Sequence, residues 1–100
     1  MTSAPRVDVL FLARNRLAFT QESFAALLEN TDWDCAQTLR VYDDGSMDGT
    51  DVWLEGQLGR VPCPVSFQRT RFGSPVAAMV HFIESAAAPL LAKVDNDAMM

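Results

Sequence analysis

The chain has 100 residues, of which 49% are apolar and 21% charged, and its formal net charge is −5. These values are typical of one ordinary soluble domain. Because Lys and Arg provide most of the affinity for nucleic acids and for anionic membranes, the acidic balance argues against both partners. No apolar stretch reaches the ~20 residues that cross a bilayer, and Cys35 and Cys63 lack metal-ligand spacing. We therefore expect a cytoplasmic protein with two free thiols and no membrane segment.

The N-terminal part of the chain combines a strand with a helix. Residues 7–12 form a run rich in β-formers, which indicates a strand buried on both faces. Thr20 is expected to be the N-cap of a helix with Phe24 on its apolar face. Phe19 and Phe24 have the spacing of a hydrophobic staple, with Phe19 just before the cap. The chain is therefore predicted to start with a strand–helix unit.

The same pattern repeats twice more, and a last strand follows. Residues 38–42 and 65–68 are predicted to be strands, with a helix at residues 50–58 between them. Ser74 is expected to cap a third helix, and residues 90–94 are predicted to form the fourth strand. The third helix carries an apolar stripe, which normally faces the core: Val76, Met79, Val80, Ile83 and Ala87.

Strands that alternate with helices predict a particular architecture. Parallel strands joined through a helix almost always have a right-handed crossover, so the βαβαβαβ order predicts a three-layer, Rossmann-like α/β fold with a parallel sheet. With strand order 3-2-1-4, the first two helices cover one face and the third helix covers the other. The fourth strand is then an unpaired edge and one face has a single helix, so we expect the chain to self-associate or to be marginally stable.

Polar residues gather at the ends of the predicted strands. In open α/β sheets, ligands bind beyond the carboxyl ends of the strands. The residues that follow the four strands are Arg14, Asn15 and Arg16, then Asp43 and Asp44, then residues 69–73, and finally residues 95–97. Four of the eight basic residues and four of the thirteen acidic residues would line this edge. This concentration is the strongest indication of function in the sequence.

The acidic segment 43–50, with the sequence DDGSMDGT, has three interpretations. It can be a loop that leads into the second helix, with Asp48 or Thr50 as the N-cap. It can also present a strand-tip carboxylate that accepts hydrogen bonds from a ligand, as acidic residues after a second strand do for ribose hydroxyls. Finally, it matches a calcium loop from Asp44 to Glu55, although the preceding residues indicate a strand and no second loop is present to pair with it.

Two further groups of charged residues would join the same edge. Asp95 and Asp97 follow the last strand, and carboxylate oxygens suit Mg²⁺ or Mn²⁺ together with substrate phosphates. Four arginines after strands one and three could meet a diphosphate: Arg14, Arg16, Arg69 and Arg71. The alternative for each of these arginines is ordinary surface charge.

Taken together, these motifs resemble the inverting family 2 glycosyltransferases, whose nucleotide-sugar-binding half has the GT-A fold. Residues 9–15 are similar to the first strand of that family and its Asn-containing tip. Residues 41–50 are close to the family motif D-D-G-S-x-D-G-T, and residues 95–97 stand where its D-x-D motif falls. The resemblance covers nearly the whole chain, and the two motifs together are far more specific than either alone.

The resemblance implies roles for the four aspartates. Asp44 would be an exposed carboxylate that hydrogen-bonds the nucleobase, and Asp43 would support its loop. Asp95 would approach the ribose or a metal-bound water. Asp97 would ligate a Mn²⁺ or Mg²⁺ ion that bridges the diphosphate.

Arg14, Asn15 and Arg71 complete the implied nucleotide-sugar site, although many members of the family carry an aromatic residue in place of Arg14. The implied reaction transfers a hexosyl group from a nucleotide diphosphate to a hydroxyl of a saccharide or other acceptor, with inversion. The chain ends three residues after Asp97. We therefore expect residues 1–100 to be the donor-binding half only, without the general base and inactive alone. A noncatalytic nucleotide- or metal-binding module is the alternative.

Overall fold

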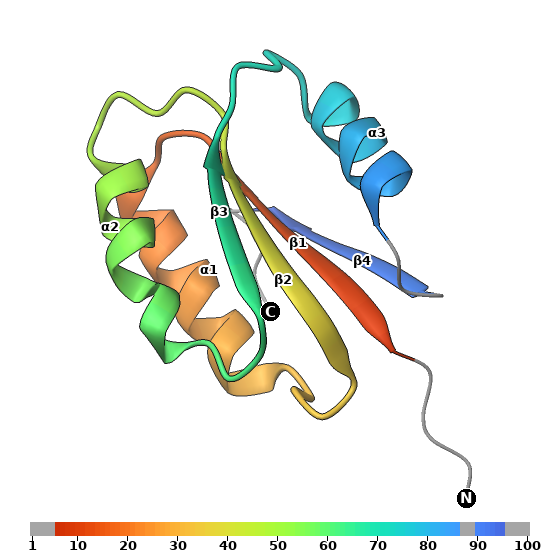
Figure 1. Ribbon diagram of the computed structural model, residues 1–100. Helices are drawn as coiled ribbons and strands as arrows, with labels where there is room; N and C mark the ends of the chain where they lie inside the picture. The colour runs from red at the N-terminus through yellow and green to blue at the C-terminus, as the bar shows by residue number, and fades with distance from the viewer. Residues whose placement is uncertain (1–5, 87–89, 96–100) are drawn as a thin grey trace, which may run out of the picture.

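The computed structural model describes residues 6–86 and 90–95, in which strands alternate with helices (Figure 1). The elements are β1 (Val7–Ala13), α1 (Leu17–Asn30), β2 (Ala36–Asp43), α2 (Thr50–Gln57), β3 (Val65–Arg69), α3 (Pro75–Ser85) and β4 (Leu90–Asp95). A short 3₁₀ turn, Leu58–Arg60, follows α2. Every predicted strand and helix is present. None of the helices in the described ranges has the length and apolar character needed to cross a membrane.

The four strands form one parallel sheet, as the sequence predicts, and their order is β3-β2-β1-β4. Figure 1 shows α1 and α2 on one face of this sheet and α3 on the other. β1 is central, because Leu12 pairs with Tyr42 on one side and with Asp95 on the other. Helices on both faces explain why β1 is an almost uninterrupted apolar run. The predicted three-layer α/β fold is therefore confirmed.

The larger core lies between the sheet and helices α1 and α2. Phe24 of α1 is at its centre, since its ring contacts Phe11 of β1 edge-on, with 5.2 Å between ring centroids, and Trp53 of α2 at 5.9 Å. Leu27 and Leu54 are fully buried on the same side. Edge-on aromatic pairs add stability beyond the apolar area that they bury. These contacts position both helices against β1 and β2.

The smaller core lies between α3 and the sheet. It shows that α3 buries a different face from the predicted apolar stripe. Ala78 and Phe82 pack against Leu10, Leu12 and Tyr42. The residues of the predicted stripe face away from the sheet: Val76 is 71% exposed, Met79 37%, Val80 47% and Ile83 52%, while Ala87 lies outside the described residues. Because α3 is apolar on both sides, helical periodicity alone does not select the face that is buried.

Arg40 of β2 fastens the C-terminal end of α3 to the sheet. Its guanidinium donates hydrogen bonds to the carbonyl oxygen of Ser85 (2.8 Å) and to the Ser85 hydroxyl. It also lies over the ring of Phe82, 5.5 Å from the ring centroid. A cation at the last carbonyl groups of a helix interacts favourably with the helix dipole. The buried face of α3 is thus held both by its core contacts and by this cation.

α1 begins at Leu17, earlier than the sequence predicts. Thr20, the predicted N-cap, lies inside the first turn, and its hydroxyl donates to the carbonyl oxygen of Arg16 (3.0 Å). The N–H of Leu17 instead donates to the carboxylate of Asp48 (3.1 Å), which is 31 residues away. Phe19 is exposed beneath the Arg16 guanidinium, so the predicted staple is wrong. An acceptor supplied by a distant loop leaves no local signal in the sequence.

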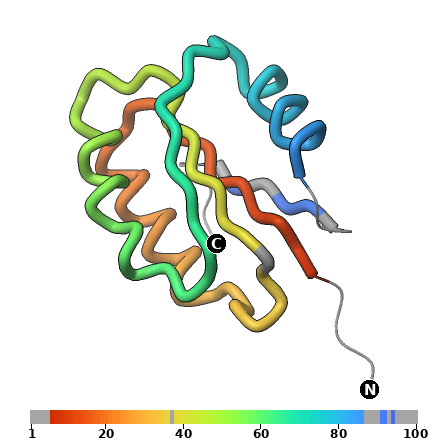
Figure 2. Tube along the Cα trace, in the orientation of Figure 1, coloured from red at the N-terminus to blue at the C-terminus, as the bar shows by residue number. Residues whose placement is uncertain are grey.

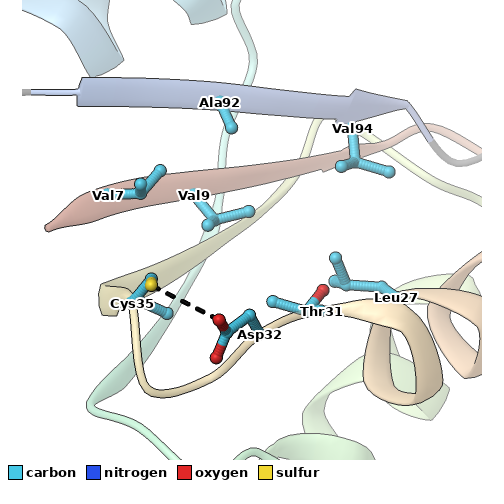
Figure 3. A pocket seen from close by; sticks show the side chains of 9 residues that line it. Val7, Val9, Leu27, Thr31, Asp32, Cys35, Ala92 and Val94 are labelled. Atoms are coloured by element: carbon cyan, nitrogen blue, oxygen red, sulfur yellow. Dashed lines mark hydrogen bonds between the residues drawn. The ribbon is translucent and has the colours of Figure 1, made fainter. Parts of the chain in front are cut away.

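An apolar cavity of about 280 Å³ lies between β1, β4 and the C-terminal end of α1 (Figure 3). Its lining residues are Val7, Val9, Leu27, Thr31, Asp32, Cys35, Ala36, Ala92 and Val94. The Cys35 thiol donates to the carboxylate of Asp32 (3.4 Å), and this bond raises the pKa of the thiol. Cys35 and Cys63 are both free thiols, as predicted.

Candidate functional site

The carboxyl ends of the strands meet at one edge of the sheet, as predicted. Ala13 of β1 pairs with Asp43 of β2, and Asp43 pairs with Arg69 of β3. On the other side of β1, Leu12 pairs with Asp95 of β4. The loops that follow β1, β2 and β3 therefore lie together at this end of the sheet (Figure 2). We call the region formed by residues 13–17, 43–50 and 69–74 the carboxyl edge.

Asn15 joins the loop after β1 to the loop after β2. Its side-chain oxygen accepts a hydrogen bond from the backbone N–H of Met47 (2.7 Å), and its own backbone N–H donates to the Ser46 hydroxyl (2.7 Å). Its φ of 55° lies in the left-handed region, which Asn adopts more readily than most residues. Asn15 thus lies at the predicted edge, where it orders the acidic loop.

Asp48 connects the N-terminal ends of two helices. One carboxylate oxygen accepts from the N–H of Leu17 at the start of α1 (3.1 Å). The other accepts from the hydroxyl and from the backbone N–H of Thr50 at the start of α2, the latter at 3.1 Å. The hydroxyl bond from Thr50, together with the backbone bonds, lowers the pKa of Asp48. The segment therefore leads into the second helix, as one interpretation predicts, but the predicted N-cap is wrong. Gly49 is the cap residue, with Asp48 just before it and Thr50 as the first residue of α2.

Asp44 is buried, which corrects the expectation of an exposed carboxylate. Only 7% of its surface is exposed. One oxygen accepts from the Thr70 hydroxyl (2.9 Å) and from the N–H of Phe72 (2.6 Å), and the other accepts from the N–H of Gly73 (3.0 Å). These donors come from the loop between β3 and α3. In this segment the sequence motifs had singled out only Arg69 and Arg71, as possible contacts of a diphosphate. Two of the three donors are backbone groups, so no side-chain pattern could have identified them.

Asp43 differs from its neighbour in how its two carboxylate oxygens are paired. It is 1% exposed, and one carboxylate oxygen accepts from the N–H of Ser46 (2.9 Å). The other oxygen, Oδ2, is buried and has no hydrogen-bond partner among the described residues. A buried carboxylate oxygen without a donor is costly, so it calls for a partner such as a water, an ion or a ligand. Asp43 also lines a polar cavity of about 120 Å³.

The other residues that line this cavity come from the loop after β2, from α2, and from the end of β3 with its following loop: Gly45, Ser46, Asp51, Arg69, Thr70 and Arg71. Arg69 is already paired, since its guanidinium donates to Asp51 (3.0 Å) and Glu55 (3.3 Å) of α2. The hydrogen bond to Glu55 has the larger effect on the pKa of Arg69, and the bond to Asp51 the next largest. Both raise it. Arg71 is exposed and lines the cavity, while Arg14 is exposed after β1. Of the predicted arginines, the structure brings Arg69 and Arg71 together with Asp43.

The predicted metal ligands lie at the limit of the described residues. Asp95 is the last residue of β4, and its backbone pairs with Leu12 of β1, next to the carboxyl edge. The side chain of Asp95 and the whole of Asp97 lie outside the described residues. Within residues 6–86 and 90–95, no group of three or more His, Cys, Asp or Glu residues could hold a metal ion. The metal site therefore stays a prediction.

The calcium-loop interpretation of segment 43–50 is wrong. The segment follows a strand, β2, rather than a helix. Asp44, its predicted first ligand, is bound to Thr70 and to two backbone amides of the loop after β3. Glu55, its predicted last ligand, pairs with Arg69 instead. These side chains are committed to different parts of the molecule and do not converge on an ion.

Comparison with solved structures identifies proteins with the same fold. The mannosyltransferase PcManGT from Pyrobaculum calidifontis, in complex with GDP-Man and Mn²⁺, matches 98% of this chain with a TM-score of 0.71 and 22% identity. Residues 1–349 of S. aureus TarS match 92% of the chain with a TM-score of 0.70, also at 22% identity. The same TarS fragment in complex with UDP-GlcNAc matches with a TM-score of 0.66. The chain shares the α/β fold of these proteins.

The chain spans only part of these structures, namely 29% of PcManGT and 27% of TarS 1–349. No protein-family model matches the sequence, and no curated protein matches it. The likeness therefore concerns the fold and not the activity of the complete neighbours.

Proposed function

We propose that the chain is the donor-binding part of a family 2 glycosyltransferase and binds a nucleotide-diphosphate sugar at the carboxyl edge. The observation that carries this proposal is Asp43 Oδ2, a buried acceptor to which no group in the described part of the chain donates, in a residue that lines a polar cavity. Two further facts support it. The edge is where open α/β sheets bind ligands, and the neighbours of the same fold include complexes with GDP-Man and UDP-GlcNAc.

In this proposal Asp43, rather than Asp44, accepts a hydrogen bond from the nucleobase. Uracil and guanine each carry a ring N–H that can donate to a carboxylate, which has acceptors only. Cytosine and adenine present an acceptor nitrogen at the corresponding ring position, and their amino groups could donate to Asp43 Oδ2 only if the base were placed differently. A hydrogen bond to a charged group contributes about 1.5–3 kcal/mol. We therefore expect a preference for UDP or GDP over CDP and ADP.

The remaining predicted residues are proposed to bind the rest of the nucleotide sugar and the metal ion. Arg71, with Arg14 and Asn15, is proposed to contact the nucleotide sugar, and Asp95 and Asp97 are proposed to hold Mn²⁺ or Mg²⁺. When bound, such an ion would stabilise the negative charge of the departing diphosphate. Arg71 needs no change of partner for this role, because it lines the cavity and is exposed.

The complete reaction is also part of the proposal. In the cytoplasm, a sugar would be transferred to an acceptor hydroxyl with inversion. This transfer requires a general base that removes the proton of the acceptor hydroxyl. No residue of this chain is assigned that role. Because the chain spans less than a third of PcManGT, we propose that these 100 residues bind the donor but do not complete turnover alone.

The test is titration calorimetry with UDP, GDP, CDP and ADP, each with and without Mn²⁺. We expect UDP or GDP to bind roughly 10-fold or more tightly than CDP and ADP, and Mn²⁺ to strengthen binding. The Asp97→Ala variant should bind the nucleotide without this dependence on Mn²⁺. Equal affinity for all four nucleotides, or no binding at all, would contradict the proposed function.

A further inference from the structure

We propose that Asp44 is a positioning residue whose carboxylate holds the loop between β3 and α3 in the conformation that places Thr70 and Arg71 beside Asp43. This inference rests on the proposed function, because it concerns the same nucleotide site. It assigns Asp44 to the loop rather than to the nucleobase.

The first argument is the number and type of the bonds that Asp44 accepts. Both carboxylate oxygens are used, and the three donors are the Thr70 hydroxyl and the consecutive backbone N–H groups of Phe72 and Gly73. Successive N–H groups that point to one anion form a concave anion-binding turn. Gly73 has a φ of 72°, a left-handed conformation that suits Gly. The turn therefore has the geometry of an anion site, and Asp44 is the anion in it.

The second argument is the place of Arg71 in that turn. It lies between Thr70 and Phe72, and both of these residues are bound to Asp44. The backbone N–H of Thr70 also donates to the carbonyl oxygen of Asp43 (2.7 Å). Residues on both sides of Arg71 are thus tied to β2 and its tip, and Arg71 and Thr70 line the cavity together with Asp43. Loss of the carboxylate would release this side of the cavity.

The third argument is that α3 has anchors of its own outside this loop. The ring of His81 in α3 contacts Tyr42 of β2, with 5.9 Å between ring centroids. Phe82 is buried against the sheet, and Ser74 accepts two backbone N–H groups at the start of α3. We therefore expect the removal of the Asp44 charge to loosen residues 70–73 without unfolding the domain.

The experiment compares Asp44→Asn with the parent by amide hydrogen exchange and by calorimetry with UDP and GDP. In the free chain, exchange at Phe72 and Gly73 should accelerate roughly 10-fold or more, while the amides of β1 stay protected. The affinity for the preferred nucleotide should fall by about 10-fold. Asp32→Asn is the matched control, because Asp32 also accepts a backbone N–H, from Asp34 (3.1 Å), but lies away from the carboxyl edge. It should change neither readout.

A second pair of variants tests the same bond from the donor side. Thr70→Val removes the hydroxyl donor and should accelerate exchange at Phe72 and Gly73, whereas Thr70→Ser keeps the donor and should restore the parent exchange rates. This pair also decides the proposal if Asp44→Asn does not fold.

The outcomes separate the possible roles of Asp44. Reduced affinity with parent-like exchange at Phe72 and Gly73 would mean direct contact with the ligand and would overturn the proposal. Faster exchange throughout β1 would indicate a general structural role and would overturn it as well. If the parent binds no nucleotide, the proposed function fails, and the exchange data alone then decide whether Asp44 positions the loop.

Discussion

Replacing Asp43 by Asn should increase stability and weaken nucleotide binding at the same time. The side chain is 1% exposed, and its Oδ2 has no donor among the described residues. The variant keeps an oxygen that can accept from the N–H of Ser46, the bond that Asp43 makes at 2.9 Å. It removes the buried charge and the acceptor that the proposed ligand uses.

The two effects have different magnitudes and can be measured separately. An unsatisfied buried polar group costs about 1–3 kcal/mol, and more if it is charged. The neutral amide should therefore raise the free energy of unfolding by about 1 kcal/mol, which corresponds to roughly 4–8 °C in Tm for a domain of this size. Loss of a hydrogen bond to a charged acceptor should lower the affinity for UDP or GDP by roughly 10- to 100-fold.

Thermal unfolding and titration calorimetry on the same preparation give both values. The matched control is Asp48→Ala in the same loop, where the carboxylate has its donors within the chain. Because it loses a helix-capping interaction, this control should be destabilised by about 1 kcal/mol. A lower Tm for Asp43→Asn, or unchanged nucleotide affinity, would refute the assignment of Asp43 as the hydrogen-bond acceptor for the nucleobase.

Three further predictions concern the core, the pH dependence and the exposed stripe of α3. Phe24→Ala should lower the free energy of unfolding by about 3–5 kcal/mol in urea denaturation, because its ring is fully buried between Phe11 and Trp53; a loss below about 1 kcal/mol would contradict this. Hydrogen bonds lower the pKa of Asp48 below the value of 3.8 expected for an unfolded chain, so its contribution is complete above that pH and is lost as the pH falls through the folded-state pKa. The effect should be small because the group is exposed, and unfolding of Asp48→Asn followed from about pH 5 to 2 should show a weaker pH dependence than the parent. Finally, Ile83→Ser should reduce the predicted self-association in sedimentation velocity and leave the unfolding free energy within about 0.5 kcal/mol, whereas parent-like association would exclude the α3 stripe as the contact.

Local patterns in the sequence were sufficient for the architecture. The apolar run in β1 predicted a strand buried on both faces, and the alternation of strands and helices predicted a parallel sheet, because parallel strands joined through a helix almost always have a right-handed crossover. Ser74 was recognised as the N-cap of α3, and its side chain accepts from the N–H groups of Val76 and Ala77. Each of these features depends on residues that are neighbours in the chain.

The same patterns did not determine which features would be exposed or paired. The helix α3 is apolar on two sides, and the stripe that periodicity favoured faces outward. The start of α1 depends on Asp48, which reaches Leu17 from a loop far along the chain. In both cases the deciding contact is between segments that are distant in sequence, so no local propensity encodes it.

Asp43 and Asp44 illustrate this division most clearly. By itself, the sequence determined that two adjacent carboxylates would stand at the tip of the second strand, at the edge where α/β sheets bind ligands. Only the tertiary structure decided their difference, because the donors Thr70, Phe72 and Gly73 reach Asp44, whereas one oxygen of Asp43 has no partner within residues 6–86 and 90–95. The physical reason is that hydrogen-bond satisfaction depends on which backbone and side-chain groups folding brings within about 3 Å, and these groups lie on a loop 26 to 29 residues further along the chain.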